Sequence, residues 1–196
     1  MNLPNKLTVS RFVLTAAFLA SFFASNLPYH ETIALVFFCL GGITDWMDGE
    51  IARRRNLITN FGILMDPLAD KILVCSAFIA FVERGQMEAW MVVIIVAREL
   101  AITGLRLLAA SKNLVLAAEG FGKHKTITQI TAIISILVLL SYSQWGVFGR
   151  LFGFAVAGKP WVVWFTSIAK WFAVLLTLFS GAMYLWRNRA VYLDET

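Results

Sequence analysis

Long apolar runs separated by short charged joins are the main pattern of this chain. A helix needs about 20 mostly apolar residues to cross a bilayer. Six stretches approach that length, at roughly residues 8–28, 32–52, 66–84, 88–110, 125–144 and 162–186. The pattern predicts an all-α integral membrane protein with six transmembrane helices, in which residues 1–196 form a single membrane-embedded domain.

The composition agrees with a membrane protein. Hydrophobic residues make up 59% of the chain and charged residues only 15%, against about a quarter in soluble domains. The mean hydropathy is +0.74. The first apolar run follows Lys6 and Arg11, as in a signal peptide, but no small-residue cleavage site follows it. We therefore expect this run to be retained as the first helix.

The distribution of basic residues predicts the orientation in the membrane. Six spans place both termini on one side, and the thirteen basic residues expected there are Lys6, Arg11, Arg53, Arg54, Arg55, Lys71, Arg98, Arg106, Lys112, Lys123, Lys125, Arg187 and Arg189. The three expected on the opposite side are Arg84, Arg150 and Lys159. Because cytoplasmic loops carry an excess of Lys and Arg, both termini are predicted to be cytoplasmic. We interpret the net charge of +5 as a topology signal and expect no nucleic-acid partner.

Four aspartates flank the second join. Asp45 and Asp48 are three residues apart, and Asp66 and Asp70 are four apart, so each pair shares a helix face. A short turn within residues 54–61 would bring the two helix ends together. Because charge at this depth is costly, it usually marks function. We therefore expect four carboxylates to converge at the cytoplasmic edge of the bilayer.

Converging carboxylates require cations, because like charges raise one another's pKa. Oxygen ligands suit Mg²⁺, Mn²⁺ or Ca²⁺, whereas Zn²⁺ favours Cys or His, and neither occurs in this segment. Several carboxylates together are typical of a two-metal site that assists displacement at phosphorus. A solvated ion-pair patch with Arg53, Arg54 and Arg55 is the alternative.

The segment resembles a family signature at eight positions, Asp45-x2-Asp48-Gly49-x2-Ala52-Arg53-x8-Gly62-x3-Asp66-x3-Asp70. This is the signature of the CDP-alcohol phosphatidyltransferase family. The resemblance implies one catalytic domain with a six-helix membrane fold, two divalent ions (Mg²⁺ or Mn²⁺) and a homodimer. It also implies transfer of a phosphatidyl group from a CDP-activated lipid to an alcohol, with release of CMP.

The same resemblance assigns roles to individual residues. Metal ligands would be Asp45, Asp48, Asp66 and Asp70. Asp70 would also be the general base, in a direct attack or through a covalent intermediate. Contacts to the CDP-lipid would come from Asn5, Thr8, Gly49, Ala52, Arg53 and Thr59. Asn5 and Thr8 could instead cap the first helix.

A second group of charges is a candidate site for the acceptor. It consists of Arg98, Arg106, Lys123 and Lys125. These four cations could bind a second phosphate. Alternatively, Arg98 forms an internal ion pair with Glu99, and the two lysines are topology anchors.

The motifs around these charges, R-E-x5-L-R and G-K-x-K-T-x2-Q, resemble the branch of the family that makes phosphatidylglycerophosphate. This implies CDP-diacylglycerol as donor and sn-glycerol 3-phosphate as acceptor. Phosphatidylglycerol, giving cardiolipin, and inositol phosphate remain alternative acceptors. A cation transporter and a membrane scaffold are the other classes considered. The family resemblance implies a bacterial inner membrane, with an organellar membrane as the alternative.

Overall fold

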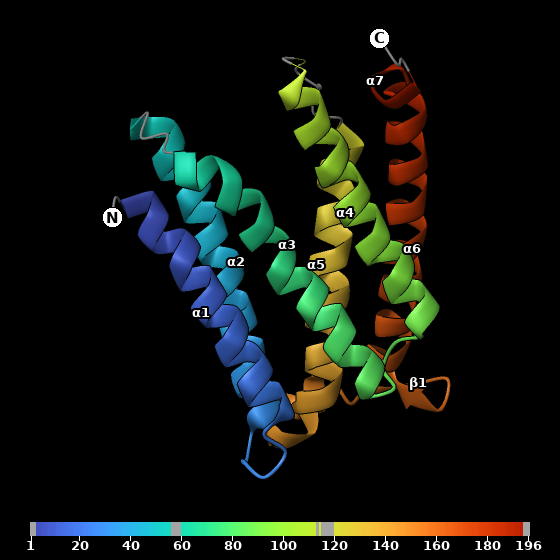
Figure 1. The fold of residues 1–196 in the computed structure, drawn as a ribbon. Helices are drawn as coiled ribbons and strands as arrows, with labels where there is room; N and C mark the ends of the chain where they lie inside the picture. Colours follow the sequence, from blue (N-terminus) through green and yellow to red (C-terminus); the bar gives the residue numbers. More distant parts are fainter. Residues whose placement is uncertain (1–2, 56–59, 113, 115–119, 194–196) are drawn as a thin grey trace.

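A computed structural model gives the fold. It describes the backbone of residues 3–55, 60–112, 114 and 120–193, and their side chains except at 3–8, 45–55, 60–67, 70, 120–123 and 190. The described chain forms six long helices and one short one (Figure 1): α1 Leu3–Phe23, α2 His30–Arg55, α3 Asn60–Glu83, α4 Ala89–Ser111, α5 Gly120–Ser141, α6 Trp161–Arg187 and α7 Ala190–Leu193. The all-helical class predicted from the apolar runs is confirmed.

The helices alternate in direction. The chain termini, the end of α2, the start of α3, the end of α4 and the start of α5 lie at one end of the bundle (Figure 1). The α1–α2 and α3–α4 connections lie at the opposite end. Both chain ends and the helix ends that carry the four aspartates therefore lie at the same end.

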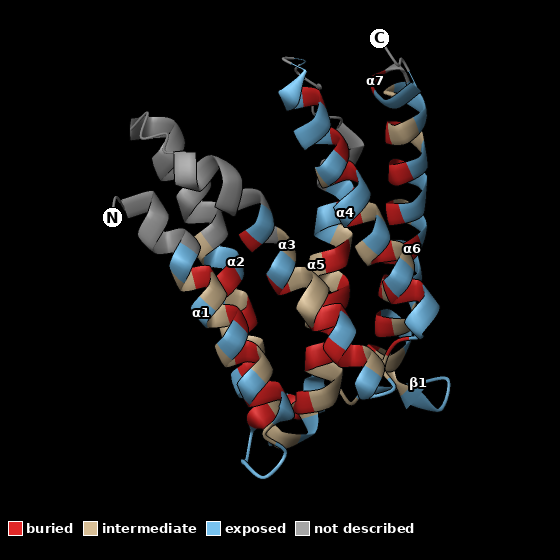
Figure 2. Ribbon diagram, viewed as in Figure 1, coloured by how far each residue is buried: buried red, intermediate tan, exposed pale blue. Residues whose placement is uncertain are grey.

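Two of the long helices meet the length and composition expected of a membrane span within the part of the chain that is described. These segments are His124–Gln144 and Trp161–Arg187, and Val9–Phe23 and His30–Thr44 are shorter apolar helices. Exposed residues follow α6 along its outer side (Figure 2), and many are large and apolar, such as Trp171 and Phe172. A helix that is apolar on its outer face as well as its inner face suits a lipid surrounding.

The aromatic core lies at the end of the bundle opposite the aspartates. The Phe22 ring centroid is 5.8 Å from that of Phe18 and 5.6 Å from that of Phe81. Arg84 Nη2 also donates to the Phe22 carbonyl over 3.1 Å. Packing of α1 against α2 and α3 is therefore fixed by buried rings and one long side chain.

The ends of the first helix and of the last connection differ from the simplest prediction. The first run was expected to extend to residue 28, but α1 ends at Phe23, and residues 24–29 form a turn in which Tyr29 has a φ of 59°. Residues 142–160 contain the short helices η1 (Tyr142–Gln144) and η2 (Phe148–Leu151), and a hairpin of β1 (Ala155–Val156) and β2 (Lys159–Pro160). This small antiparallel hairpin was not predicted.

Helices α4 and α6 approach closely at Gly181. A Cβ atom at this position would lie 2.7 Å from Cγ of Arg98. Small residues permit such close helix packing in membrane proteins. The glycine thus fixes the stem of Arg98 beside its neighbour Glu99.

Replacing Gly181 with Ala is expected to lower the free energy of unfolding by about 1–3 kcal/mol, because the methyl group must displace the Arg98 stem. Thermal unfolding in detergent micelles measures the change. Gly104→Ala is the matched control on α4, since nothing lies within 4 Å of its added Cβ. Equal melting temperatures for the two variants would contradict the close contact.

Candidate functional site

Glu99 of α4 lies at the centre of a buried polar cluster. Glu99 is only 1% exposed. Lys71 Nζ of α3 is 2.8 Å from Oε2, and Lys125 Nζ of α5 contacts Oε1. Arg98 Nη1 and Gln129 Nε2 each donate to Oε1 over 3.3 Å. We call these five residues the Glu99 cluster.

Helix periodicity explains why these groups meet. Glu99 occupies the same buried face of α4 as Ile95 and Ile102. Lys125 and Gln129 are four residues apart on α5, so both can face α4. A buried carboxylate is costly unless cations and hydrogen bonds satisfy it, and the cluster supplies both.

The cluster continues into α6 through Gln129. Its Nε2 atom also donates to Oγ1 of Thr177 over 2.9 Å, and both residues are buried. The network therefore connects α3, α4, α5 and α6. Ion pairs and hydrogen bonds between helices in a buried polar network favour one register of those helices.

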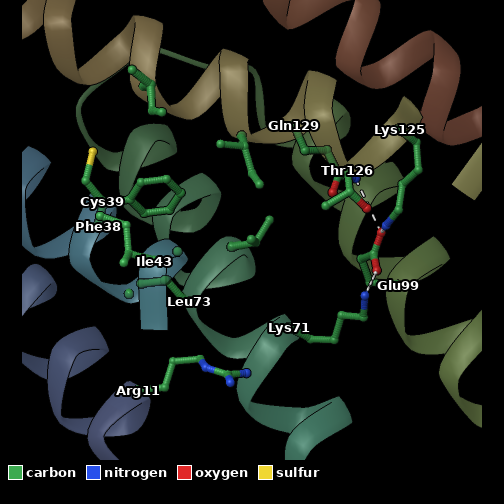
Figure 3. A pocket seen from close by; sticks show the side chains of 15 residues that line it. Arg11, Phe38, Cys39, Ile43, Lys71, Leu73, Glu99, Lys125, Thr126 and Gln129 are labelled. Carbon is green, nitrogen blue, oxygen red and sulfur yellow. Dashed lines mark hydrogen bonds and ion pairs between the residues drawn. The ribbon is translucent and has the colours of Figure 1, made fainter. Parts of the chain in front are cut away.

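A cavity of about 530 Å³ lies beside the cluster. Arg11, Lys71, Glu99 and Lys125 contribute its charged groups, and Figure 3 shows Lys71 and Lys125 reaching Glu99 from two helices. The other lining residues are Phe38, Cys39, Gly41, Gly42, Ile43, Leu73, Val74, Thr126, Gln129, Ile130 and Ile134. A wall with grouped cations beside an apolar wall can bind a ligand that has an anionic and an apolar part.

The cavity borders the helices that carry the aspartate signature. Ile43 of α2 lines it two residues before Asp45, and Lys71 of α3 lines it directly after Asp70. Residues of both helices therefore line the cavity next to the signature. The side chains of Asp45, Asp48, Asp66 and Asp70 lie outside the described residues. Among the side chains that are described, no three His, Cys, Asp or Glu residues form a metal-binding group.

The predicted CDP-lipid contacts also fall outside the described side chains. They are Asn5, Thr8, Gly49, Ala52, Arg53 and Thr59. Of the predicted acceptor residues, Lys123 lies outside them as well. Arg98 and Lys125 meet at Glu99, so the internal ion pair of Arg98 with Glu99 is present.

Arg106 lies apart from this group, although the sequence assigned it to the same site. It is not among the residues that line the cavity. Its Nε atom donates to Oη of Tyr184 over 3.3 Å, and its guanidinium carbon lies 5.6 Å from the Tyr184 ring centroid. The described contacts thus place Arg106 against α6.

Lys71 and Arg11 were not among the site residues predicted from the sequence. Both were counted only as basic residues on the cytoplasmic side, yet both line the cavity, and Arg11 is buried. A signal was available for each. Arg11 and Lys71 occur within or beside an apolar run, where a cation is costly and often functional.

Known proteins resemble this chain over almost its whole length. Residues 1–179 match the CDP-alcohol phosphatidyltransferase family. A Bacillus subtilis (strain 168) protein named CDP-diacylglycerol–glycerol-3-phosphate 3-phosphatidyltransferase is 37% identical, over 95% of each chain. Proteins of the same name from Rickettsia bellii (strain RML369-C) and Escherichia coli (strain K12) are each 33% identical. The Rickettsia bellii match covers 93% of each chain, and the Escherichia coli match covers 99% of this chain and 98% of the relative.

Replacing Thr177 with Val is expected to destabilise the fold by about 1 kcal/mol, because Gln129 loses a buried hydrogen-bond acceptor. Chemical or thermal unfolding in detergent measures the loss. Thr103→Val is the control: its hydroxyl bonds the Glu99 carbonyl within the same helix over 2.8 Å. That carbonyl can retain a helical partner, so the expected change is below about 0.5 kcal/mol. Equal losses would argue against the α5–α6 bond.

Proposed function

The chain belongs to the CDP-alcohol phosphatidyltransferase family, and on this premise we propose that it transfers a phosphatidyl group from CDP-diacylglycerol to sn-glycerol 3-phosphate. The products are phosphatidylglycerophosphate and CMP. Three relatives named for this reaction are 33–37% identical over nearly all of the chain. One observation on the structure carries the choice of acceptor: a cavity with a cationic wall lies directly beside the helices of the aspartate signature.

The acceptor assignment follows from the charges around the cavity. Among its described lining residues, Arg11, Lys71 and Lys125 are cations and Glu99 is the one acid. Such a wall suits a phosphate monoester better than a neutral alcohol. Within the predicted set, we assign the acceptor phosphate to Arg98, Lys123 and Lys125, of which Lys125 lines the cavity. Arg106 contacts Tyr184 and is left out of the proposed site. The alternative acceptors, phosphatidylglycerol and inositol phosphate, are distinguished by the product that each would give.

The proposed reaction is one direct displacement. Asp70 accepts the proton of the acceptor hydroxyl, whose oxygen then attacks the phosphorus that carries the diacylglycerol. A new phosphorus–oxygen bond forms, the bond to CMP breaks, and CMP leaves. Lys71 directly follows Asp70 and lines the cavity, which would place the acceptor beside its base.

The signature aspartates fit a divalent-metal site by their chemistry, since carboxylate oxygens are the ligands that Mg²⁺ and Mn²⁺ prefer. The residues that would hold two ions are Asp45, Asp48, Asp66 and Asp70. When bound, such ions neutralise the diphosphate and make CMP a better leaving group. The nucleotide would lie along Asn5, Thr8, Gly49, Ala52, Arg53 and Thr59.

The proposal places the enzyme in a bacterial inner membrane with six spans. Six long helices alternate in direction, and both termini lie at the end of the bundle that carries the signature. Because predicted cytoplasmic basic residues gather at this end, the termini and active site would be cytoplasmic. A homodimer is proposed from the family resemblance alone.

Replacing Asp70 with Asn is expected to reduce product formation by at least about 100-fold, because it removes the proposed base and one metal ligand. Release of CMP from CDP-diacylglycerol with glycerol 3-phosphate measures the loss, with and without Mg²⁺ or Mn²⁺. Glu83→Gln, at the opposite end of α3, is the control and should retain the parent rate. An Asp70→Asn enzyme with the parent rate would rule out this base.

Replacing Lys125 with Met is expected to raise the glycerol 3-phosphate KM by about 10-fold or more, because the variant loses a charge-assisted contact to phosphate. The CDP-diacylglycerol KM should stay within about twofold. Lys112→Met is the control, since Lys112 is exposed and its Nζ donates to the Val191 carbonyl. An unchanged acceptor KM would show that the replaced residue does not bind the acceptor phosphate.

A further inference from the structure

We propose that Glu99 is a positioning residue, which holds the ammonium groups of Lys71 and Lys125 at the cavity wall so that both can bind the phosphate of the acceptor. The role of Glu99 rests on the proposed function. This positioning role adds Lys71 to the acceptor site. It also gives a reason for an acidic residue in a site that binds an anion.

The two lysines reach one carboxylate from different helices. Lys71 of α3 is 2.8 Å from Oε2, whereas Lys125 of α5 contacts Oε1. The width of the Glu99 carboxylate therefore sets the spacing of the two ammonium groups. Each ammonium has three N–H donors, so a bond to Glu99 does not by itself use up the donors that a phosphate would need.

Glu99 is needed because the two lysines would otherwise repel each other. The Lys125 side chain is only 4% exposed, so water does little to screen its charge. The Lys71 side chain is 32% exposed and has a long flexible stem. Without the carboxylate, we expect repulsion to move the Lys71 ammonium away from that of Lys125, so that the paired geometry is lost.

The carboxylate is itself held in place. Gln129 donates to its Oε1 and, through the same nitrogen, to Thr177 of α6. Arg98 also donates to Oε1, while its stem packs on Gly181. The Gln129 bond comes from α5 and the Arg98 bond from α4 itself, with the Arg98 stem held against α6, and together they restrict rotation of the carboxylate. An anchor with this support keeps both ammonium groups fixed before substrate arrives.

The arrangement also suggests a basis for choosing between acceptors. The charged groups that line the described part of the cavity are three cations and one carboxylate. A phosphate monoester carries close to two negative charges at neutral pH, whereas a phosphodiester carries one. Paired lysines held by Glu99 therefore favour a phosphate monoester such as glycerol 3-phosphate over phosphatidylglycerol.

The test begins with Glu99→Gln, which preserves the size of the side chain and removes its charge. The glycerol 3-phosphate KM is expected to rise at least about 10-fold, with the CDP-diacylglycerol KM within about twofold of the parent. Glu88→Gln is the matched control, because Glu88 is exposed just before α4. A merely structural role would reduce the amount of folded enzyme and leave its acceptor KM unchanged, which would overturn the proposal.

A double-mutant cycle tests whether Glu99 acts through the lysines. In a Lys71→Met/Lys125→Met enzyme, adding Glu99→Gln should change the acceptor KM by less than about twofold, because no ammonium groups remain to be positioned. The same fold-change as in the parent background would overturn the proposal.

Lys71→Met keeps the test decisive if Glu99→Gln does not fold, because Glu99 retains Lys125, Arg98 and Gln129. This variant is expected to raise the acceptor KM at least about 10-fold, and an unchanged KM would overturn the role of Lys71. Product formation by the parent enzyme distinguishes failure of the proposed function from failure of the positioning role alone. If it makes no phosphatidylglycerophosphate, the proposed function fails. If it makes product while Glu99→Gln retains the parent acceptor KM, only the positioning role fails.

Discussion

A carboxylate buried inside an apolar helix bundle must be neutralised, and this constraint organises the centre of the protein. Glu99 is almost fully buried, and side chains from α3 and α5 meet it there. Removing a carboxylate and an ammonium group from water is costly, so the ion pair stabilises the fold only if its geometry is well defined. Two contacts with α6 fix this geometry: the bond from Gln129 to Thr177 and the packing of Arg98 on Gly181.

The Glu99 cluster also relates the two halves of the proposed reaction. Helices α2 and α3 carry the aspartate signature, while α4 and α5 supply the buried cations and their carboxylate. Lys71 belongs to both halves, because it follows Asp70 on α3 and reaches Glu99 on α4. A shift of α3 relative to α4 would therefore move the proposed base and Lys71 together, relative to Glu99 and Lys125. The cavity has charged groups on one wall and apolar side chains on the rest of its surface. Such a lining suits a reaction between a lipid and a water-soluble alcohol.

Local patterns were enough to predict much of the fold and part of the site. The apolar runs predicted the six long helices, because burial in lipid or protein requires a continuous apolar surface. Turn geometry was harder to predict: α1 stops at Phe23, and residues 155–160 form a small hairpin that no apolar pattern indicated. Lys71 and Arg11 were taken for topology signals, because basic residues near the ends of apolar runs usually mark the cytoplasmic side, although a cation at such a depth is also a functional signal.

The sequence by itself determined the chemistry: four aspartates at helical spacing, a family signature and a surplus of cations beside it. These features depend on residue type and on spacing within one segment. Only the tertiary structure decided the partners, bringing Lys71 and Lys125 to Glu99 and setting Arg106 against Tyr184. The physical reason is that each of these contacts joins different helices. Their relative rotation and approach are set by packing, as at Gly181, and not by the sequence of either helix alone.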